Sequence, residues 1–319
     1  MSKLKFAVGV DLGGTSIKVG VVSKEGKIEK KISVDTLADG GPDIVIHQIK
    51  KGIDLVLDKY EKQVVGIGIG SPGVVAAKKG MVEHPPNLPG WEKVPLGKII
   101  EKAYKIDTFV ENDANAAAVG ELIFGAGKGL ENFIMVTLGT GVGSGLIING
   151  KLYRGETGAA GELGHITIDY KGPQCNCGNI GCVETYVGNN YMVERVSGEL
   201  GSHPESKIFE LLDNNLGQLS PKIICDAANS GDQYAKSVVV ETGRYLGYGL
   251  ASVVNLLDIS KIIIGGGVAG FGKLLFDSIQ DTIKERTLKS LKERVEVLPA
   301  KLKNEAGILG ASALVFYQS

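Results

Sequence analysis

The sequence predicts an α/β protein built from two related domains, on three grounds. At 319 residues, the chain is longer than a single hydrophobic core usually supports. Apolar strand-like segments alternate with helical ones in its first half. Glycine-rich turns directly follow apolar strands at three places, as is common where an α/β protein binds ligands.

The first half of the chain gives the clearest alternation. We expect a helix at 42–60, a buried strand at 64–70, a helix at 96–104 and a strand at 108–112. After the middle of the chain the pattern becomes mostly helical, at 206–213, 220–230 and 232–257. The strand KIIIGGG follows, and the apolar segment NEAGILGASALVF predicts a short closing helix.

Two of the glycine-rich segments resemble each other. VDLGGTSIKVGVV near the start and TLGTGVGSGLII in the middle share apolar and glycine positions at one fixed offset, and each continues into a hairpin turn. The repeating unit consists of a strand, a glycine turn, a second strand and a hairpin. Its occurrence twice predicts two related domains whose glycine turns meet at a cleft. Two unrelated hairpins are the alternative.

Composition excludes several classes of partner. The chain carries 35 basic and 36 acidic residues, a formal net charge of -1, without long like-charged blocks. We therefore expect a small-molecule partner and neither nucleic acid nor a membrane surface. The N-terminal segment lacks a signal-peptide pattern and no apolar run reaches roughly 18 residues, so a cytoplasmic protein is expected.

The first glycine turn, DLGGTSIK, is suited to an anion. Gly13 and Gly14 allow a tight turn with exposed backbone N–H groups, and Thr15 and Lys18 add a hydroxyl and a cation for phosphate oxygens. The turn is neither a dinucleotide fingerprint nor a Walker loop, because an apolar strand follows it in place of a helix. Asp11 beside it can hold Mg²⁺ through water. A hairpin without a ligand is the alternative.

Two further glycine turns strengthen the nucleotide interpretation. GTGVG supplies a second loop of the same type, and a triple glycine after a buried strand would let a base or ribose approach the backbone. Together the three loops favour a nucleoside triphosphate, ATP. The residues expected to contact it here are Gly139, Thr140, Gly141, Gly143, Gly265, Gly266 and Gly267.

Asp113 lies where the strand TFVEN ends and the alanine-rich segment DANAAAVGELIFG begins. Strand ends of this kind expose ligand-binding residues in α/β proteins. Asp is also a common first residue of a helix, so an N-cap is the alternative role.

Three of the four cysteines lie close together, in CNCGNIGC. Cys175, Cys177 and Cys182, with His165 upstream, supply three thiolates and one imidazole, the set of a closed tetrahedral Zn²⁺ site. A closed site leaves no position for a reacting water, so the metal would be structural. A DNA-binding zinc finger is disfavoured, since a basic recognition helix is missing, and a disulfide is disfavoured in a reducing compartment. Cys225, apart from the others, is expected in the core.

The motifs DLGGTSIK, ENDANAAA, TLGTGVGSG, GELGH, CNCGNIGCVE and IIIGGGVAG, in this order, resemble the ROK family of sugar kinases and repressors within the actin-like ATPase superfamily. The resemblance covers almost the whole chain. It implies a duplicated, ribonuclease H-like α/β fold with a cleft between two domains. One would comprise 1–117 plus 304–319, and the other, 118–303, would carry the ATP site and the zinc loop.

The resemblance also assigns roles to single residues. Asp113 matches the catalytic base that accepts a proton from the sugar C6 hydroxyl as it attacks the γ-phosphate. His165 would bind zinc through one nitrogen and a sugar hydroxyl through the other. The positions that match sugar-binding residues are Gly73, Asn87, Asn112, Asp113, Glu162, His165 and Glu184. Asn87, which precedes a proline by two positions, is also a turn former.

These roles imply an ATP-dependent hexose kinase, with glucose as the expected substrate and ATP, Mg²⁺ and structural Zn²⁺ as cofactors. Mannose, N-acetylmannosamine, N-acetylglucosamine and fructose are alternative substrates. A sugar-responsive repressor of the same family is a further alternative, disfavoured here because only five residues precede the first strand, and a cytoskeletal or chaperone ATPase would leave the sugar motifs without a purpose. Relatives suggest a homodimer or homotetramer.

Overall fold

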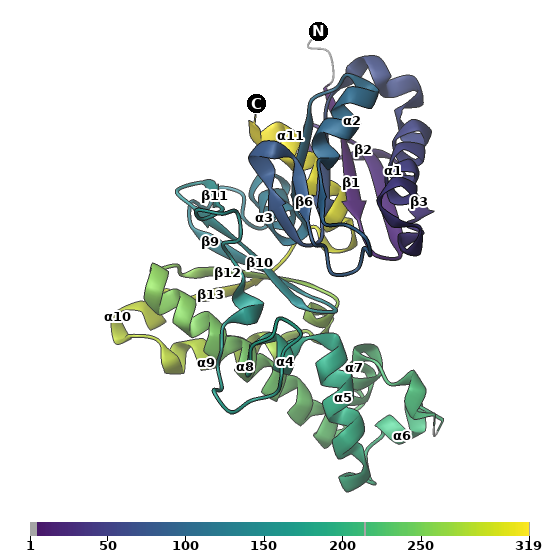
Figure 1. Ribbon diagram of the computed structural model, residues 1–319. Coiled ribbons are helices and arrows are strands. Elements are labelled where there is room, and N and C mark those ends of the chain that lie inside the picture. Colours follow the sequence, from purple (N-terminus) through teal and green to yellow (C-terminus); the bar gives the residue numbers. More distant parts are fainter. Residues whose placement is uncertain (1–4, 214, 319) are drawn as a thin grey trace. The chain divides into compact units, whose positions relative to one another are not determined.

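The computed structural model describes residues 5–213 and 215–318 (Figure 1). Contacts divide the chain into two compact units. Unit 1 comprises Met1–Glu131, Gly145–Gly161 and Ala300–Ser319, and unit 2 comprises Asn132–Ser144 and Glu162–Pro299. Within the described ranges, no helix is both long and apolar enough to cross a membrane. The domain boundary expected after Ala117 falls inside a helix of unit 1, and the domain limits themselves stay a prediction.

Unit 1 is built around a five-stranded sheet in the order β3-β2-β1-β4-β8. Strand β1 pairs with β2 as an antiparallel hairpin and with β4 in parallel, and β4 pairs in parallel with β8. The strands are β1 (Phe6–Leu12), β2 (Ser16–Ser23), β3 (Ile28–Asp35), β4 (Val64–Ser71) and β8 (Thr108–Asn112). A small second sheet contains β5 (Val74–Ala76), β6 (Met81–Glu83) and β7 (Lys93–Val94).

Helices α1 (Gly41–Leu57) and α2 (Leu96–Tyr104) pack their apolar residues into the main core of unit 1. In α1, Val45, Ile49, Ile53 and Val56 recur at helical spacing and are fully buried. Trp91 belongs to the same core cluster. This burial of one stripe on each helix fixes α1 and α2 against the sheet.

Helices α3 (Asp113–Phe124) and α11 (Ala306–Gln318) pack together and against the strands of unit 1 (Figure 1). The contact depends on glycine. A Cβ at Gly68 in β4 would lie 1.8 Å from the carbonyl oxygen of Ala311, and one at Gly9 in β1 would lie 2.2 Å from that of Ile308. The last helix therefore lies directly on the backbone of β1 and β4.

A further five-stranded sheet repeats this arrangement of strands, in the order β11-β10-β9-β12-β13. The division into units falls within β10, so that β9, β12 and β13 belong to unit 2 and β11 to unit 1. Strand β12 pairs in parallel with both β9 and β13, as β4 does with β1 and β8. The strands are β9 (Phe133–Leu138), β10 (Val142–Ile148), β11 (Lys151–Tyr153), β12 (Lys261–Gly266) and β13 (Glu296–Pro299).

The helices of unit 2 centre on α8 (Gln233–Leu257), which packs against α7 (Pro221–Asn229) and α9 (Lys273–Arg286). The side chain of Asp232 caps α8 by accepting the Ala235 N–H. The remaining helices are short: α4 (Glu184–Val187), α5 (Asn189–Glu199), α6 (Ile208–Leu211) and α10 (Lys289–Lys292).

The predicted α/β class is confirmed, and the matching strand orders bear out the duplication. The helix expected at 96–104 and the strand at 108–112 agree with α2 and β8 at both ends. The helix expected at 206–213 is shorter, because only Ile208–Leu211 is helical. The predictions omitted α5, whose apolar positions are few and leave only Met192 and Val196 buried.

Candidate active site

The parallel strands of unit 1 place several predicted residues at one edge of the sheet. Asp11 at the end of β1 pairs in register with Gly70 of β4, and Gly70 pairs with Glu111 of β8. Asn112 is the last residue of β8 and Asp113 the first of α3. The carboxyl ends of parallel strands are the usual ligand-binding edge of an α/β sheet.

The first glycine turn is a tight hairpin between β1 and β2. The N–H of Gly13 donates to the carbonyl of Ser16 at 3.1 Å, and the hydroxyl of Thr36 donates to the carbonyl of Gly13 at 2.6 Å. A Cβ at Gly14 would lie 2.9 Å from the Cβ of Asn87, so the structure brings these two predicted residues together. Thr15 is exposed.

Asp11 and Lys18 face each other beside this turn, with Nζ of Lys18 3.9 Å from Oδ2 of Asp11. Burial raises the pKa of Asp11, and the charge of Lys18 partly opposes that rise. A Cβ at Gly307 in α11 would lie 2.1 Å from Oδ2. A half-buried carboxylate in such a position would gain from a bound cation.

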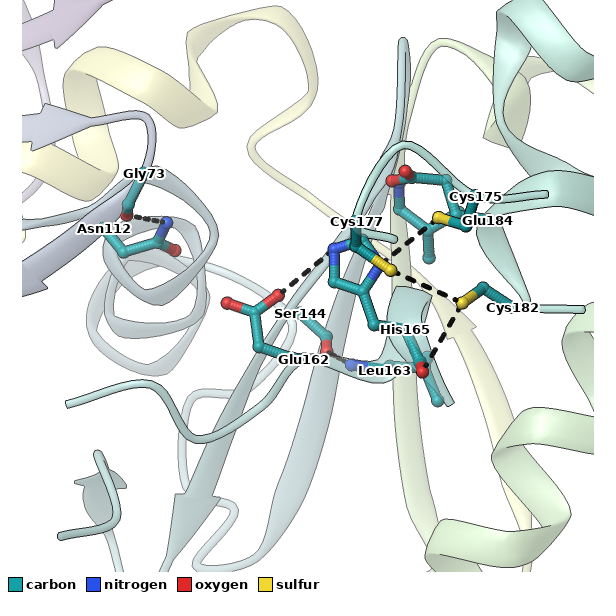
Figure 2. Close-up of polar contacts among 11 residues, drawn as sticks. Gly73, Asn112, Ser144, Glu162, Leu163, His165, Cys175, Cys177, Cys182 and Glu184 are labelled. Carbon is teal, nitrogen blue, oxygen red and sulfur yellow. Dashed lines mark hydrogen bonds and ion pairs between the residues drawn. The ribbon is translucent and has the colours of Figure 1, made fainter. Parts of the chain in front are cut away.

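Asp113 does not need to cap α3, because Asn112 does so. Oδ1 of Asn112 accepts from the N–H groups of Ala114 at 3.0 Å and Asn115 at 3.2 Å. Its Nδ2 donates to the carbonyl of Gly73 at 3.1 Å (Figure 2). Asp113 itself is exposed, and its Oδ1 accepts from the N–H of Ala114 at 2.8 Å. The N-cap alternative therefore belongs to Asn112, and the Asp113 carboxylate is accessible at the strand end.

Glu111, the first residue of the END motif, is almost completely buried, with 1% of its surface exposed. Its Oε2 lies 2.6 Å from Nε of Arg154, and its Oε1 accepts from the backbone of Asn112 and the side chain of Asn115. Neither Glu111 nor Arg154 is among the site residues expected from the sequence. A glutamate directly after Phe109 and Val110, near the end of the strand, was the available signal.

In unit 2, the second and third glycine turns also share one sheet edge. Gly265 and Gly266 of β12 pair in register with Thr137 and Leu138, just before the GTGVG turn. Gly266 has a positive φ of 89°, and a Cβ there would lie 2.1 Å from the Leu138 carbonyl oxygen, so this glycine lets the two strand ends meet. Thr140 is exposed, and Gly139, Gly141 and Gly143 are partly exposed.

A cavity of about 510 Å³ lies beside the GTGVG turn. The N–H of Asn189 donates to the carbonyl of Gly139 at 3.0 Å, which joins the cavity to the turn. The Oδ1 of Asn189 is buried without a hydrogen-bond partner. The cavity is lined by Asn189, Asn190, Val193, Glu194, Ser197, Leu219, Ser220 and Pro221.

Glu184 is bound to the GTGVG turn. Its Oε2 accepts the Val142 N–H at 2.9 Å, and a Cβ at Gly141 would lie 2.3 Å from the same oxygen. On the other side of the turn, the Leu163 N–H donates to Oγ of Ser144 at 3.3 Å. The GELGH segment and the helix that follows the cysteines therefore both support this loop (Figure 2).

His165, Cys175, Cys177 and Cys182 form one cluster, in which the four ligand atoms lie within 4.8 Å of one another. Sγ of Cys177 lies 3.8 Å from Sγ of Cys182, and Sγ of Cys175 lies 3.8 Å from Nδ1 of His165. Tetrahedral zinc with Zn–S bonds of about 2.3 Å separates its sulfurs by roughly 3.8 Å. All four cysteines of the chain are free thiols here. The spacing fits a zinc ion and is too long for a disulfide.

The protonation of the thiols also favours a cation. Burial raises the pKa of Cys175 and raises that of Cys182 to about 12, whereas the backbone N–H of Asn179 lowers that of Cys177. Two buried thiolates would be unfavourable without a positive charge between them. Cys225 is partly exposed, so its expected core position is wrong; its Sγ lies 3.6 Å from the carbonyl of Gly270.

His165 presents its two nitrogens to different partners. Nδ1 faces the sulfur of Cys175, and Nε2 lies 4.0 Å from Oε2 of Glu162, which is exposed (Figure 2). With Nδ1 turned to the cluster, Nε2 and Glu162 remain together on the open side. The structure thus brings two predicted sugar-binding residues of unit 2 together.

Comparison with known proteins gives a consistent result. The family model described as "ROK family" matches residues 7–317. A glucokinase of Thermotoga maritima is 38% identical over 99% of this chain and 98% of its own length. A xylose repressor of Caldicellulosiruptor bescii is 31% identical over 97% of this chain and 77% of its own length.

Solved structures agree. The crystal structure of a ROK family glucokinase from Streptomyces griseus in complex with glucose and AMPPNP has a TM-score of 0.85 and 36% identity, with 97% of this chain and 98% of that chain covered. The similarity extends over both contact units and includes every motif described above. The chain therefore belongs to the ROK family.

Proposed function

We propose that this protein is an ATP-dependent glucokinase, which transfers the γ-phosphate of ATP to the C6 hydroxyl of glucose. One observation carries the proposal: Asp113 presents an exposed carboxylate at the carboxyl end of β8, while Asn112 caps the helix in its place. The glucokinase relatives and the glucose-bound structure of S. griseus support the choice of sugar.

Asp113 acts as the base. Its carboxylate accepts the proton of the sugar hydroxyl as that oxygen forms a bond to the γ-phosphorus and the bond to the β,γ-bridging oxygen breaks, leaving ADP. A weak base is sufficient, because phosphoryl transfer passes through a loose transition state in which alignment and charge neutralisation contribute most.

The sugar is recognised by rigid polar groups. In unit 1 these are Gly73, Asn87 and Asn112, of which Asn112 is fixed by three hydrogen bonds. In unit 2 they are Glu162, His165 and Glu184. Buried hydrogen-bonding groups discriminate between sugars strongly, because a missing hydroxyl leaves one of them unpaired.

The nucleotide binds the glycine turns. Apart from the N–H groups of Gly13, Gly139 and Val142, which are paired within the protein, backbone N–H groups of the turns at Gly13–Gly14 and 139–143 would hold phosphate oxygens. Thr15, Lys18 and Thr140 are exposed beside them. The turn at Gly265–Gly267 and the cavity beside Asn189 would hold the nucleoside. Asp11 would hold Mg²⁺, which neutralises phosphate charge during transfer.

Zinc held by His165, Cys175, Cys177 and Cys182 would be structural, since four protein ligands complete its coordination. Within this loop, Cys182 and Glu184 are two residues apart, and Glu184 binds the N–H of Val142. The metal-binding loop therefore fixes His165 and Glu184 together. We also propose that the protein acts as a homodimer or homotetramer.

The proposal is tested with ATP and a panel of hexoses, by measuring kcat/KM for glucose, mannose, N-acetylmannosamine, N-acetylglucosamine and fructose. We expect glucose to give the highest value. A different preferred hexose would retain the kinase and reject glucokinase. Failure to phosphorylate any hexose, together with sugar-dependent binding of the protein to DNA, would favour the family's repressors.

A further inference from the structure

Glu111 and Arg154 form an ion pair directly behind the strand-to-helix turn that carries Asp113. Glu111 is 1% exposed, and its Oε2 lies 2.6 Å from Nε of Arg154, whose side chain is 30% exposed. Arg154 follows β11, more than forty positions away in the chain, and both residues belong to unit 1. The pair is not part of a strand ladder, since β8 pairs with β4 and Arg154 lies after the end of β11.

The carboxylate of Glu111 also accepts two hydrogen bonds from this turn. Its Oε1 accepts the Asn112 N–H at 3.0 Å and the side-chain amide of Asn115 at 3.2 Å. Asn115 is 2% exposed and lies in the first turn of α3. Glu111 therefore holds the last residue of the strand and the first turn of the helix, the residues on either side of Asp113.

We infer that Arg154 and Glu111 are positioning residues for Asp113. Only the catalytic part of this inference rests on the proposed function. Without Arg154, a fully buried carboxylate would lose its counter-charge, and it would have to move, admit water or bind a proton. Each of these changes alters the hydrogen bonds to Asn112 and Asn115, and so displaces the Asp113 carboxylate. Neither Arg154 nor Glu111 needs to touch the substrate.

Four variants test the pair. Arg154→Met should lower kcat by about ten- to a hundredfold, since small displacements of a reacting group have effects of this size. The KM for ATP should stay within about twofold, because Glu111 and Arg154 contact none of the residues assigned to ATP, and the loss in kcat should exceed any rise in the glucose KM that follows from a shift of Asn112. Arg154→Lys, which keeps the charge, should recover most of kcat. Lys151→Met, an exposed cation of β11, is the matched control and should behave as wild type.

Glu111→Gln completes a double-mutant cycle. Alone, it leaves one acceptor oxygen in place of two, so its NH2 group faces either Nε of Arg154 or the donors of Asn112 and Asn115, and kcat should fall. Combined with Arg154→Met, it replaces an unpaired buried charge with a neutral amide, so the double variant should be more active than Arg154→Met. Additive losses in the cycle would contradict the pairing.

Hydrogen exchange of residues 112–116 gives a readout independent of activity. Arg154→Met should increase exchange there, and Lys151→Met should leave exchange at the wild-type rate. Unaltered exchange and kcat would overturn the inference, as would a raised glucose KM with unchanged kcat, which would mean that Arg154 contacts sugar. A wild-type protein without kinase activity would reject the proposed function, and the exchange data would still decide the positioning.

Discussion

Asp113 and Asn112 divide two tasks that the sequence alone could not separate. Either residue can cap a helix, and only the structure shows that Oδ1 of Asn112 accepts the N–H groups of both Ala114 and Asn115. The position of Asp113 at a strand end was predictable, because the short strand TFVEN comes before it and an alanine-rich helical segment follows it. The support from Glu111 and Arg154 was not, because it joins residues distant in the chain.

Tyr104 gives a prediction at the scale of one residue. Its hydroxyl lies 2.7 Å from Oδ1 of Asp54 and 2.9 Å from the carbonyl of Lys50, so it links α2 to α1. Burial, followed by the bond to Asp54, raises the pKa of Tyr104 well above its ordinary value of 10.0. The folded state thus holds this proton more tightly than the unfolded state does.

The raised pKa contributes stability that is fully present below about pH 10 and is lost as the pH rises further. Tyr104→Phe should therefore reduce the free energy of unfolding near pH 7 by about 1 kcal/mol, the value of one hydrogen bond, and the difference should shrink above pH 10. Thermal unfolding measured from pH 7 to 11 checks this. Tyr170→Phe, at an exposed ring, is the control, and a gap that widens with pH would contradict the assignment.

At the scale of elements, the loop that contains the cysteines has little regular structure of its own. The loop contains two isolated β-bridges, which pair Thr167 with Cys182 and Gln174 with Ile180. Its four candidate ligand atoms lie within 4.8 Å of one another, and it reaches the GTGVG turn through Glu184. The His/Cys cluster could be recognised from residue type and spacing. The bond from Glu184 to Val142 could not, since no local pattern specifies it.

This connection predicts that zinc affects both substrates. Cys177→Ser should bind less zinc, unfold at a lower temperature and lose about tenfold or more in activity, with raised KM values for glucose and for ATP. Metal analysis, thermal unfolding and steady-state kinetics on the same preparations provide the test. Cys225→Ser, at the cysteine outside the cluster, should retain zinc and both KM values. A zinc-free Cys177→Ser protein with normal kinetics would exclude the supporting role.

At the scale of the whole molecule, the duplication could be predicted from the sequence, because short, strongly apolar strands recur with glycine at matching positions. The strand orders β3-β2-β1-β4-β8 and β11-β10-β9-β12-β13 repeat one plan. The packing of α11 against the sheet could not be predicted from the sequence. The sequence gives no sign that Gly68 admits the backbone of Ala311, because this depends on where a distant helix lies.

The central claim is that Asp113 accepts the proton of the attacking sugar hydroxyl. The most direct measurement is kcat for glucose phosphorylation by Asp113→Asn, with the affinities for glucose and ATP measured on the same protein. We expect kcat to fall by several orders of magnitude and binding to stay nearly unchanged, because the amide keeps the size of the side chain and cannot take the proton. An Asp113→Asn protein that turns over glucose at the wild-type rate would contradict it.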